Sequence, residues 1–106
     1  MVKNIFNGET EKKDITVRFA ENLENMLEND NAVENMDADL MFAWGGVLTP
    51  LLEKYPERML RCGIAEENMI GTAAAMSVMG LKPIVHSFAS FIARRAFDQI
   101  FLSGAY

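Results

Sequence analysis

The sequence predicts an α/β fold in which a parallel sheet carries helices on its faces. Three short segments with strand character alternate with four segments of helical character along the 106 residues. Such alternation is typical of parallel sheets, because a helix supplies the crossover between neighbouring strands. Half of the residues are apolar and 24% are charged, so the chain can bury one modest hydrophobic core and forms one domain at most.

The first half of the chain contains two predicted helices and one predicted strand. Residues 14–29 place apolar side chains at helical spacing between Glu and Asn residues, which predicts an amphipathic helix. Residues 32–36 are predicted to form a strand, a weak one because a glutamate and an asparagine interrupt it. Residues 47–55 form a second predicted helix, which stops before Pro56 because the residue preceding a proline disfavours helical backbone angles. The apolar positions of the first helix are Ile15, Phe19, Leu23, Met26 and Leu27.

The second half continues the same alternation. Residues 58–62 are predicted to form a short strand, and residues 66–79 a helix with Gly80 as its C-terminal cap. Residues 83–86 are predicted to form a buried strand and residues 90–102 a final helix. Three short strands are few for a sheet of this class, so we expect the chain to hold the front part of a longer domain.

Composition and charge argue against several function classes. The net charge of −5 disfavours a nucleic-acid binder, because such proteins neutralise phosphates with Lys and Arg. No apolar run reaches the roughly 20 residues that span a bilayer, and the N-terminus lacks the apolar core of a signal peptide. Cys62 is the single cysteine and cannot form an internal disulfide. We therefore expect a cytoplasmic protein, with residues 1–12 as a flexible, polar lead-in and residues 13–106 as the domain.

A glutamate at the start of the third predicted helix is the first candidate for a functional residue. Glu66 follows Gly63 by three positions and precedes Gly71 and three alanines. A carboxylate in the first turn of a helix lies near the positive end of the helix dipole, which keeps it ionised. Gly63 permits a sharp turn and a close approach to a ligand, and the small residues permit another backbone to pack against the helix. The alternative is a glutamate that only stabilises its helix, among alanines chosen for helix propensity.

The second candidate region follows the third predicted strand, at the edge where parallel sheets place their ligands. Phe88 and Phe91 could present a flat apolar wall to an aromatic ring, or they could fill the core. His86 could carry a proton, or it could be a packing residue. Arg95 and Asp98 have the spacing of a surface ion pair on a helix.

Six short motifs occur along residues 13–106 in a defined order. They are Asp-Ala-Asp-Leu at 37–40, Tyr-Pro-Glu-Arg at 55–58, Gly-Ile-Ala-Glu at 63–66, Gly-Leu-Lys-Pro at 80–83, Phe-x-x-Phe at 88–91 and Arg-Ala-Phe-Asp-Gln at 95–99. In order and spacing this stretch resembles the aminopyrimidine-binding domain of the transketolase family, which includes the split transketolases and the deoxyxylulose-phosphate synthases.

The resemblance implies a thiamine-diphosphate-dependent enzyme and gives roles to four residues. Glu66 matches the catalytic glutamate that hydrogen-bonds a ring nitrogen of the cofactor's aminopyrimidine, which promotes the tautomer that removes the thiazolium proton. Phe88 and Phe91 match aromatic positions beside the pyrimidine ring, and Asp39 matches an aspartate near the positively charged thiazolium. The resemblance also implies that Mg²⁺ and the diphosphate are held by a partner domain outside this chain, which itself supplies no metal ligand.

The implied activity is transfer of a two-carbon ketol unit between sugar phosphates. Because the family's cofactor lies between domains of different subunits, we expect a diphosphate-binding domain or subunit as partner, in a homo- or hetero-oligomer, and no catalysis by this chain alone. His86, Arg94 and Arg95 could face the substrate channel or an interface. The competing hypothesis is a truncated, non-catalytic relict that only folds and self-associates. A reading frame that continues past Tyr106 would favour the enzyme, and a stop codon there would favour the relict.

Overall fold

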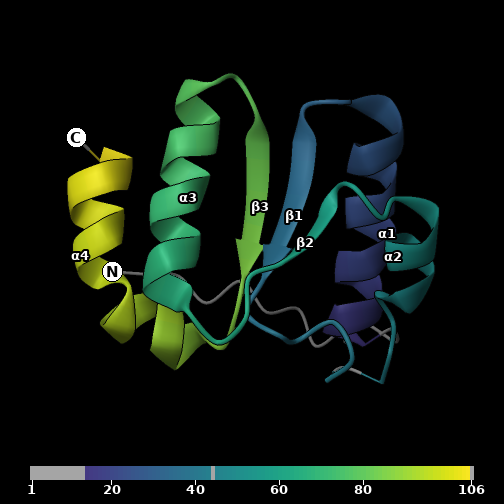
Figure 1. The fold of residues 1–106 in the computed structure, drawn as a ribbon. Coiled ribbons are helices and arrows are strands. Elements are labelled where there is room, and N and C mark those ends of the chain that lie inside the picture. The colour runs from purple at the N-terminus through teal and green to yellow at the C-terminus, as the bar shows by residue number, and fades with distance from the viewer. Residues whose placement is uncertain (1–13, 44, 106) are drawn as a thin grey trace, which may run out of the picture.

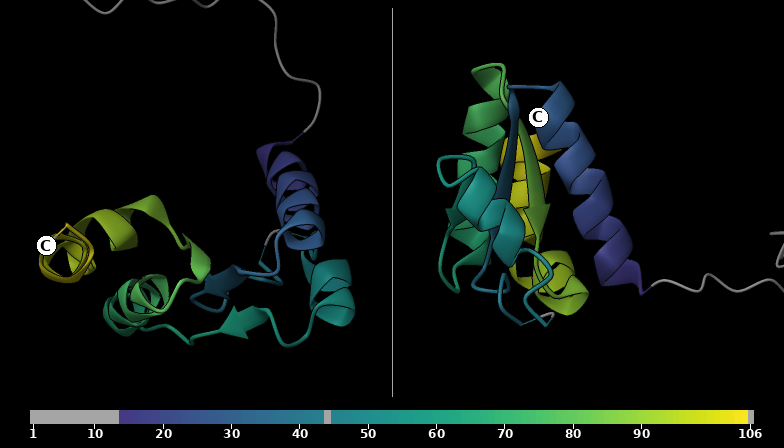
Figure 2. Two further views of the ribbon diagram at one scale, coloured as in Figure 1. Left: turned by 90° about the horizontal axis from the view of Figure 1, so that it is seen from above. Right: turned by 90° about the vertical axis from the view of Figure 1, so that its right-hand side faces the viewer.

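A three-stranded parallel sheet separates two layers of helices in the computed structural model, which describes residues 14–43 and 45–105. The strands β1 (Val33–Asp37), β2 (Met59–Arg61) and β3 (Lys82–His86) lie in the order β2-β1-β3. The helices α1 (Ile15–Asn29) and α2 (Thr49–Lys54) cover one face, and α3 (Glu66–Val78) covers the other (Figures 1 and 2). The predicted α/β fold is therefore confirmed. The predicted lead-in, residues 1–12, lies outside the described residues.

Helix α1 begins and ends where the sequence predicts, with local hydrogen bonds at both ends. The backbone N–H of Thr16 donates to Asp14 Oδ1 at 2.8 Å, which caps the first turn. The backbone N–H of Asp30 bonds to the carbonyl of Met26 at 3.0 Å and closes the last turn. The apolar face buries Leu23 and Leu27 completely, which anchors α1 to the sheet.

Strand β1 is central, although its sequence predicts a weak strand. It pairs in parallel with β2 on one edge and with β3 on the other, with Asp37 opposite Arg61 and His86. Asn35 and Asp37 are fully buried in the sheet. The side-chain amide of Asn35 has no hydrogen-bond partner among the described residues, which is costly in a protein interior. Backbone pairing on both edges outweighs the poor strand propensity.

A glycine follows the end of α3 and caps the helix. Helix α3 ends at Val78, and Gly80 follows with φ +91°, where the N–H of Leu81 bonds to the carbonyl of Met76 at 3.0 Å. The predicted glycine cap is thus confirmed.

Each face of the sheet has its own apolar core. The core on the α1 side consists of Leu23, Leu27, Val33, Met41, Leu48, Leu51 and Met59, and the core on the α3 side consists of Met36, Ala38, Met69 and Ala73.

The C-terminal segment is helical, as predicted, but it is not one regular α-helix. Two stretches with π-helical hydrogen bonding, Phe91–Arg95 (η1) and Ile100–Ala105 (η2), flank the single α-helical turn Phe97–Gln99 (α4). The chain bends at Ala96, which has φ −96° and ψ 12° and is completely buried. After this bend the segment runs along the outer side of α3, away from the sheet (Figures 1 and 2).

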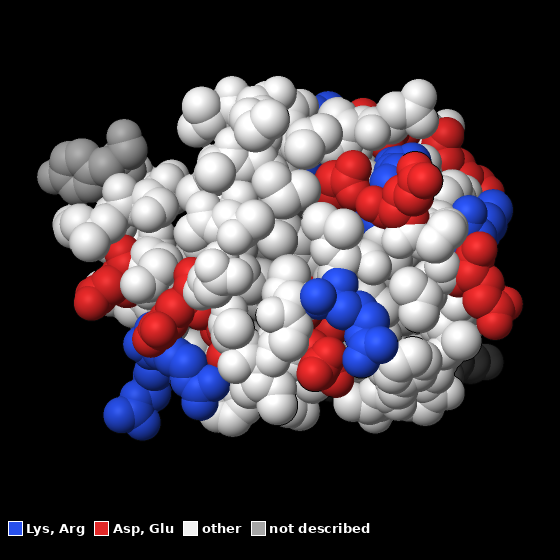
Figure 3. Space-filling model, viewed as in Figure 1, with Lys and Arg blue, Asp and Glu red and all other residues white. Residues whose placement is uncertain are grey.

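Charged side chains are unevenly spread over the surface. Figure 3 shows almost none over the upper part of α3, whereas acidic and basic groups gather over the right half of this face and at its lower left. Large apolar side chains are exposed at the end of α3 and along the C-terminal segment. They include Val78, Met79, Phe97, Phe101 and Leu102. Within residues 14–43 and 45–105, no helix has the length and apolar character needed to cross a membrane.

Candidate functional site

The turn between β2 and α3 places a glutamate at the carboxyl edge of the sheet. Gly63 adopts φ +72°, a left-handed conformation that favours glycine, and a Cβ there would meet nothing within 4 Å. Gly63 is therefore required by the turn rather than by close packing. Helix α3 then begins at Glu66, and its N-cap residue Ala65 offers no side-chain cap.

Glu66 is a buried carboxylate with both oxygens engaged. Glu66 is only 1% exposed. Arg95 Nη1 donates a hydrogen bond to its Oε2 at 2.7 Å, and Ser87 Oγ donates one to its Oε1 at 3.2 Å. Its own backbone N–H holds the pKa of the Glu66 carboxyl below the usual 4.5, and Arg95 and Ser87 act in the same direction while burial opposes them. Glu66 is therefore ionised at neutral pH.

A small pocket of about 110 Å³ opens beside Glu66. All four residues to which the family resemblance gives a role line this pocket, although they follow three different strands of the sheet. Pockets for drug-sized molecules enclose about 300–1,000 Å³, so this pocket has room for a single small ring. Its lining is Ala38, Asp39, Leu40, Ile64, Glu66, Ser87, Phe88 and Phe91.

The two phenylalanines line the pocket but do not form the flat wall that the sequence suggested. The ring centroids of Phe88 and Phe91 lie 5.7 Å apart and their planes meet at 80°, an edge-to-face arrangement. Their residues are 50% and 38% exposed, so neither fills the core. Because the rings are nearly perpendicular, one can present its face to a ligand while the other presents an edge.

Asp39 reaches the pocket through an unusual turn. It has φ +63°, the one positive φ of a non-glycine residue in the described chain. The buried Asp37 stabilises this turn, because its Oδ1 accepts a hydrogen bond from the Leu40 N–H at 3.0 Å. The carboxylate of Asp39 is partly exposed and forms an ion pair with Arg61 Nη2 at 3.2 Å. No local pattern in the sequence indicated this ordering role of Asp37.

The residues whose roles stayed open occupy different places. His86 does not line the pocket; its ring packs edge-to-face on Phe19 of α1, with centroids 5.1 Å apart. Burial lowers the pKa of the His86 imidazole, and the Asp37 carboxylate partly offsets this. Arg95 pairs with Glu66 and not with Asp98, which corrects the predicted surface pair.

A larger hollow of about 530 Å³ lies next to the pocket, lined by Ser90, Phe91, Arg94 and Arg95. Basic side chains gather in this region, over the segment that follows β3 (Figure 3). Phe91 lines both the hollow and the pocket, so it stands between them.

The expected close packing at Gly71 is not seen among the described residues, since a Cβ there would meet nothing within 4 Å.

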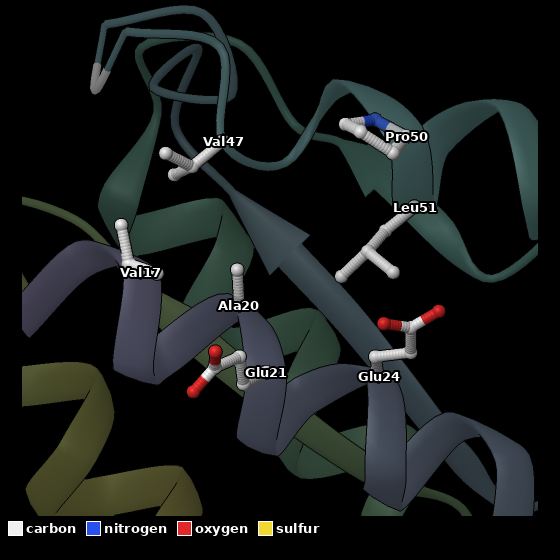
Figure 4. Close-up of a pocket in the computed structure, with 7 residues that line it drawn as sticks. All are labelled: Val17, Ala20, Glu21, Glu24, Val47, Pro50 and Leu51. Carbon is white, nitrogen blue, oxygen red and sulfur yellow. The ribbon is translucent and has the colours of Figure 1, made fainter. Parts of the chain in front are cut away.

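Another hollow, of about 230 Å³, lies between α1 and α2 (Figure 4). Val17, Ala20, Val47, Pro50 and Leu51 give it an apolar surface, and two carboxylates lie at its rim. Both carboxylates already have partners in the chain: Glu21 pairs with Arg18 and Glu24 with Lys54. No set of three or more His, Cys, Asp or Glu residues suited to a metal ion occurs in the described part of the chain.

Comparison with known proteins gives a consistent family. The transketolase pyrimidine-binding domain matches residues 11–105. The 6-deoxy-6-sulfo-D-fructose transketolase subunit of Clostridium sp. (strain MSTE9) is 42% identical over 79 residues, 74% of this chain and 24% of that protein. The 1-deoxy-D-xylulose-5-phosphate synthase of Heliobacterium modesticaldum (strain ATCC 51547 / Ice1) is 31% identical over 83 residues, 78% of this chain and 12% of that protein.

A solved structure agrees with the sequence matches. A split-gene transketolase, described as an inactive β4 tetramer, superimposes with a TM-score of 0.68 and 36% identity. The match covers 82% of this chain and 29% of that one, so the chain spans less than a third of the length of each of these relatives. Transketolases as a family depend on thiamine diphosphate. The chain belongs to the transketolase family and corresponds to its pyrimidine-binding domain.

Proposed function

We propose that residues 13–106 form the N-terminal part of an aminopyrimidine-binding domain and supply half of a thiamine-diphosphate site. The complete enzyme would transfer a two-carbon ketol unit between sugar phosphates. The observation that carries this proposal is Glu66, a buried, ionised carboxylate beside a pocket of about 110 Å³ that is large enough for a single ring. We place the activity in the cytoplasm, as the sequence predicts.

The residues of the pocket fit an aminopyrimidine ring. Its walls include the apolar side chains of Leu40, Ile64, Phe88 and Phe91, which suit the faces of a planar aromatic group. Ser87 donates to Glu66 Oε1 at 3.2 Å, a long hydrogen bond for a hydroxyl donor, so a ring nitrogen can take its place. The apolar side chains together with the buried Glu66 carboxylate suit a heteroaromatic ring that donates a hydrogen bond.

The chain's own residues would bind the ring and control one proton. Glu66 Oε1 would share a proton with the ring nitrogen, and its burial removes competing water from that contact. Phe88 and Phe91 would fix the plane of the ring. Asp39, partly exposed at the pocket rim, would place negative charge near a cationic part of the cofactor. When bound, thiamine diphosphate supplies the electron sink for the chemistry, while the protein supplies orientation and proton control.

The remaining parts of the site would come from a partner. On this proposal a diphosphate-binding domain or subunit would hold Mg²⁺ and the diphosphate, as the family resemblance implies. The description of one relative as a transketolase subunit and of another as a split-gene transketolase supports a divided enzyme. The substrate would be an anionic ketose, a sugar phosphate or, as the name of the Clostridium relative suggests, a sulfosugar.

A second candidate function is self-association without catalysis. The apolar side chains exposed on α3 and the C-terminal segment favour it, because a patch of this kind on a protein surface marks an interaction site. The tetrameric state named for the inactive split-gene transketolase supports the same idea. On this reading the chain would form homo-oligomers and would not bind the cofactor.

Calorimetric titration distinguishes the two functions. Thiamine diphosphate with Mg²⁺ is titrated into the chain mixed with the diphosphate-binding subunit of the same enzyme. We expect saturable binding that Glu66→Gln weakens at least tenfold and that Glu67→Gln, an exposed first-turn control, leaves unchanged. Absence of binding by a folded mixture, or equal effects of the two substitutions, would contradict the cofactor role.

A further inference from the structure

The two oxygens of Glu66 have partners of very different strength. Arg95 Nη1 lies 2.7 Å from Oε2, within the short range of charge-assisted bonds. Ser87 Oγ lies 3.2 Å from Oε1, where a hydroxyl bond is long and weak. A ligand that enters the pocket would therefore displace the serine from Oε1 before it displaced the arginine from Oε2.

Arg95 approaches Glu66 from outside the pocket. The pocket is lined by Glu66 and Ser87 but not by Arg95, which lines the larger hollow on the other side of Phe91. The Arg95 guanidinium also lies 4.8 Å from the centre of the Phe91 ring, a cation–π contact that restrains it. Arg95 can thus keep its contact with Glu66 while the pocket is filled.

We propose that Arg95 is a positioning residue that holds Glu66 through Oε2, so that Oε1 stays ionised and directed into the pocket. Ser87 is the temporary partner of Oε1 and gives way to the ligand. The identity of that ligand as an aminopyrimidine rests on the proposed function, whereas the action of Arg95 on Glu66 does not.

The consequence concerns where the shared proton resides. With Arg95 in place, Glu66 stays a carboxylate and a proton shared with a ring nitrogen is held mainly by the ring. Without Arg95, the backbone N–H of Glu66 and Ser87 act alone against burial, so the shared proton moves toward Glu66. In the described part of the chain, Arg95 is the one cation paired with Glu66. Arg95 therefore supplies the positive charge beside the Glu66 carboxylate, in addition to the hydrogen bonds from the Glu66 N–H and Ser87.

The test measures the pKa of the Glu66 carboxyl by ¹³C NMR of the labelled chain, with Glu66→Gln used to assign its signal. We expect Arg95→Gln to raise this pKa by about one unit or more, because it removes an adjacent opposite charge. Arg95→Lys keeps the charge but not the planar fork, and we expect a smaller rise. Arg94→Gln, a change in the neighbouring arginine of the same hollow, should leave the pKa unchanged.

The outcomes separate the role of Arg95 from the proposed function. An Arg95→Gln chain that folds and titrates Glu66 like Arg94→Gln would overturn the proposal. If Arg95→Gln does not fold, the result for Arg95→Lys decides the matter. A Glu66 pKa and ligand contacts that are unchanged in Arg95→Lys would show that the guanidinium is not needed and would overturn the proposal.

A second readout uses thiamine as the probe and follows the ring protons of Phe88 and Phe91. We expect Arg95→Gln to weaken thiamine binding about tenfold or more and Arg94→Gln, outside the pocket lining, to preserve it. Equal weakening by both would also overturn the proposal. If wild-type chain mixed with its partner subunit fails to bind thiamine, the cofactor role fails, and the pKa measurement still decides the action of Arg95.

Discussion

Arg58 offers the strongest single test of how the fold is held together. Its guanidinium donates three hydrogen bonds to backbone carbonyls: Nη1 to Leu27 at 2.9 Å, Nη2 to Asp30 at 2.7 Å and Nε to Val33 at 2.9 Å. These carbonyls belong to the end of α1 and the start of β1, where helix carbonyls lack partners within the helix. Arg58 therefore joins the connection before β2 to the one before β1.

The magnitude follows from these contacts. A hydrogen bond to a charged group contributes about 1.5–3 kcal/mol, but the three are coupled and the half-buried carbonyls regain water in the variant. We expect Arg58→Ala to lower the free energy of unfolding by about 2–4 kcal/mol, a large share of the roughly 5–15 kcal/mol that stabilises a domain. In a domain of this size each kcal/mol lowers Tm by about 4–8 °C.

Urea unfolding followed by circular dichroism measures this effect. The matched control is Lys82→Ala, because Lys82 Nζ contacts Asp30 Oδ2 at 2.6 Å in the same region but its side chain is 64% exposed. An exposed ion pair contributes at most about 1 kcal/mol. Arg58→Lys should fall between the two, since one ammonium cannot reach three carbonyls. If Arg58→Ala costs no more than Lys82→Ala, the bonds do not hold the fold and the reasoning is refuted.

Three further predictions concern pH, backbone conformation and association. Burial lowers the pKa of His86 in the folded chain below its usual 6.5, although the nearby Asp37 carboxylate opposes the shift; the ring of Phe19 also faces the imidazole. As the pH falls, the unfolded chain therefore binds a proton at His86 at a higher pH than the folded chain does. Stability measured by urea unfolding should fall as pH drops below about 6.5, and His86→Phe should flatten this slope. Gly63→Ala should cost about 1–2 kcal/mol through its positive φ alone, and a cost near zero would show that the turn relaxes. Sedimentation should show self-association that Phe101→Glu reduces; a concentration-independent monomer would exclude an interface there.

Much of the fold is predictable from local patterns. The spacing of Leu23 and Leu27 identifies α1, and the glycine at position 80 marks the end of α3. These signals act within one or two turns of chain, so they appear in the sequence without knowledge of neighbours. The sequence predicts only a weak strand at β1, because strand propensity does not include the stabilisation that β1 gains by pairing with β2 on one edge and β3 on the other.

The bend at Ala96 was not predicted for a related reason. Ala96 is a good helix former, and its complete burial beside α3 depends on tertiary packing. Similarly, helical periodicity over residues 90–102 is consistent with either α- or π-helical bonding, which differ in the carbonyl that accepts each N–H.

In the candidate site, too, the residues are predictable from local sequence, whereas their tertiary contacts are not. Glu66, Phe88, Phe91 and Asp39 were named one by one, and the pocket brings them together. The contact between Arg95 and Glu66 spans 29 positions of sequence, and local spacing favoured Asp98 as the partner. Buried charges are commonly paired with an opposite charge, so the burial of Glu66 is the signal that could have pointed to Arg95.

The most direct test of the central claim is the rate of hydrogen–deuterium exchange at C2 of thiamine diphosphate in the complex of this chain with its diphosphate-binding subunit and Mg²⁺. Positioned acids and bases contribute about 10²–10⁴-fold to proton transfer. We expect the complex to accelerate exchange and Glu66→Gln to lower the rate by at least 10²-fold, while Glu67→Gln leaves it unchanged. Acceleration that survives Glu66→Gln would contradict the assignment of Glu66 as the residue that controls the proton.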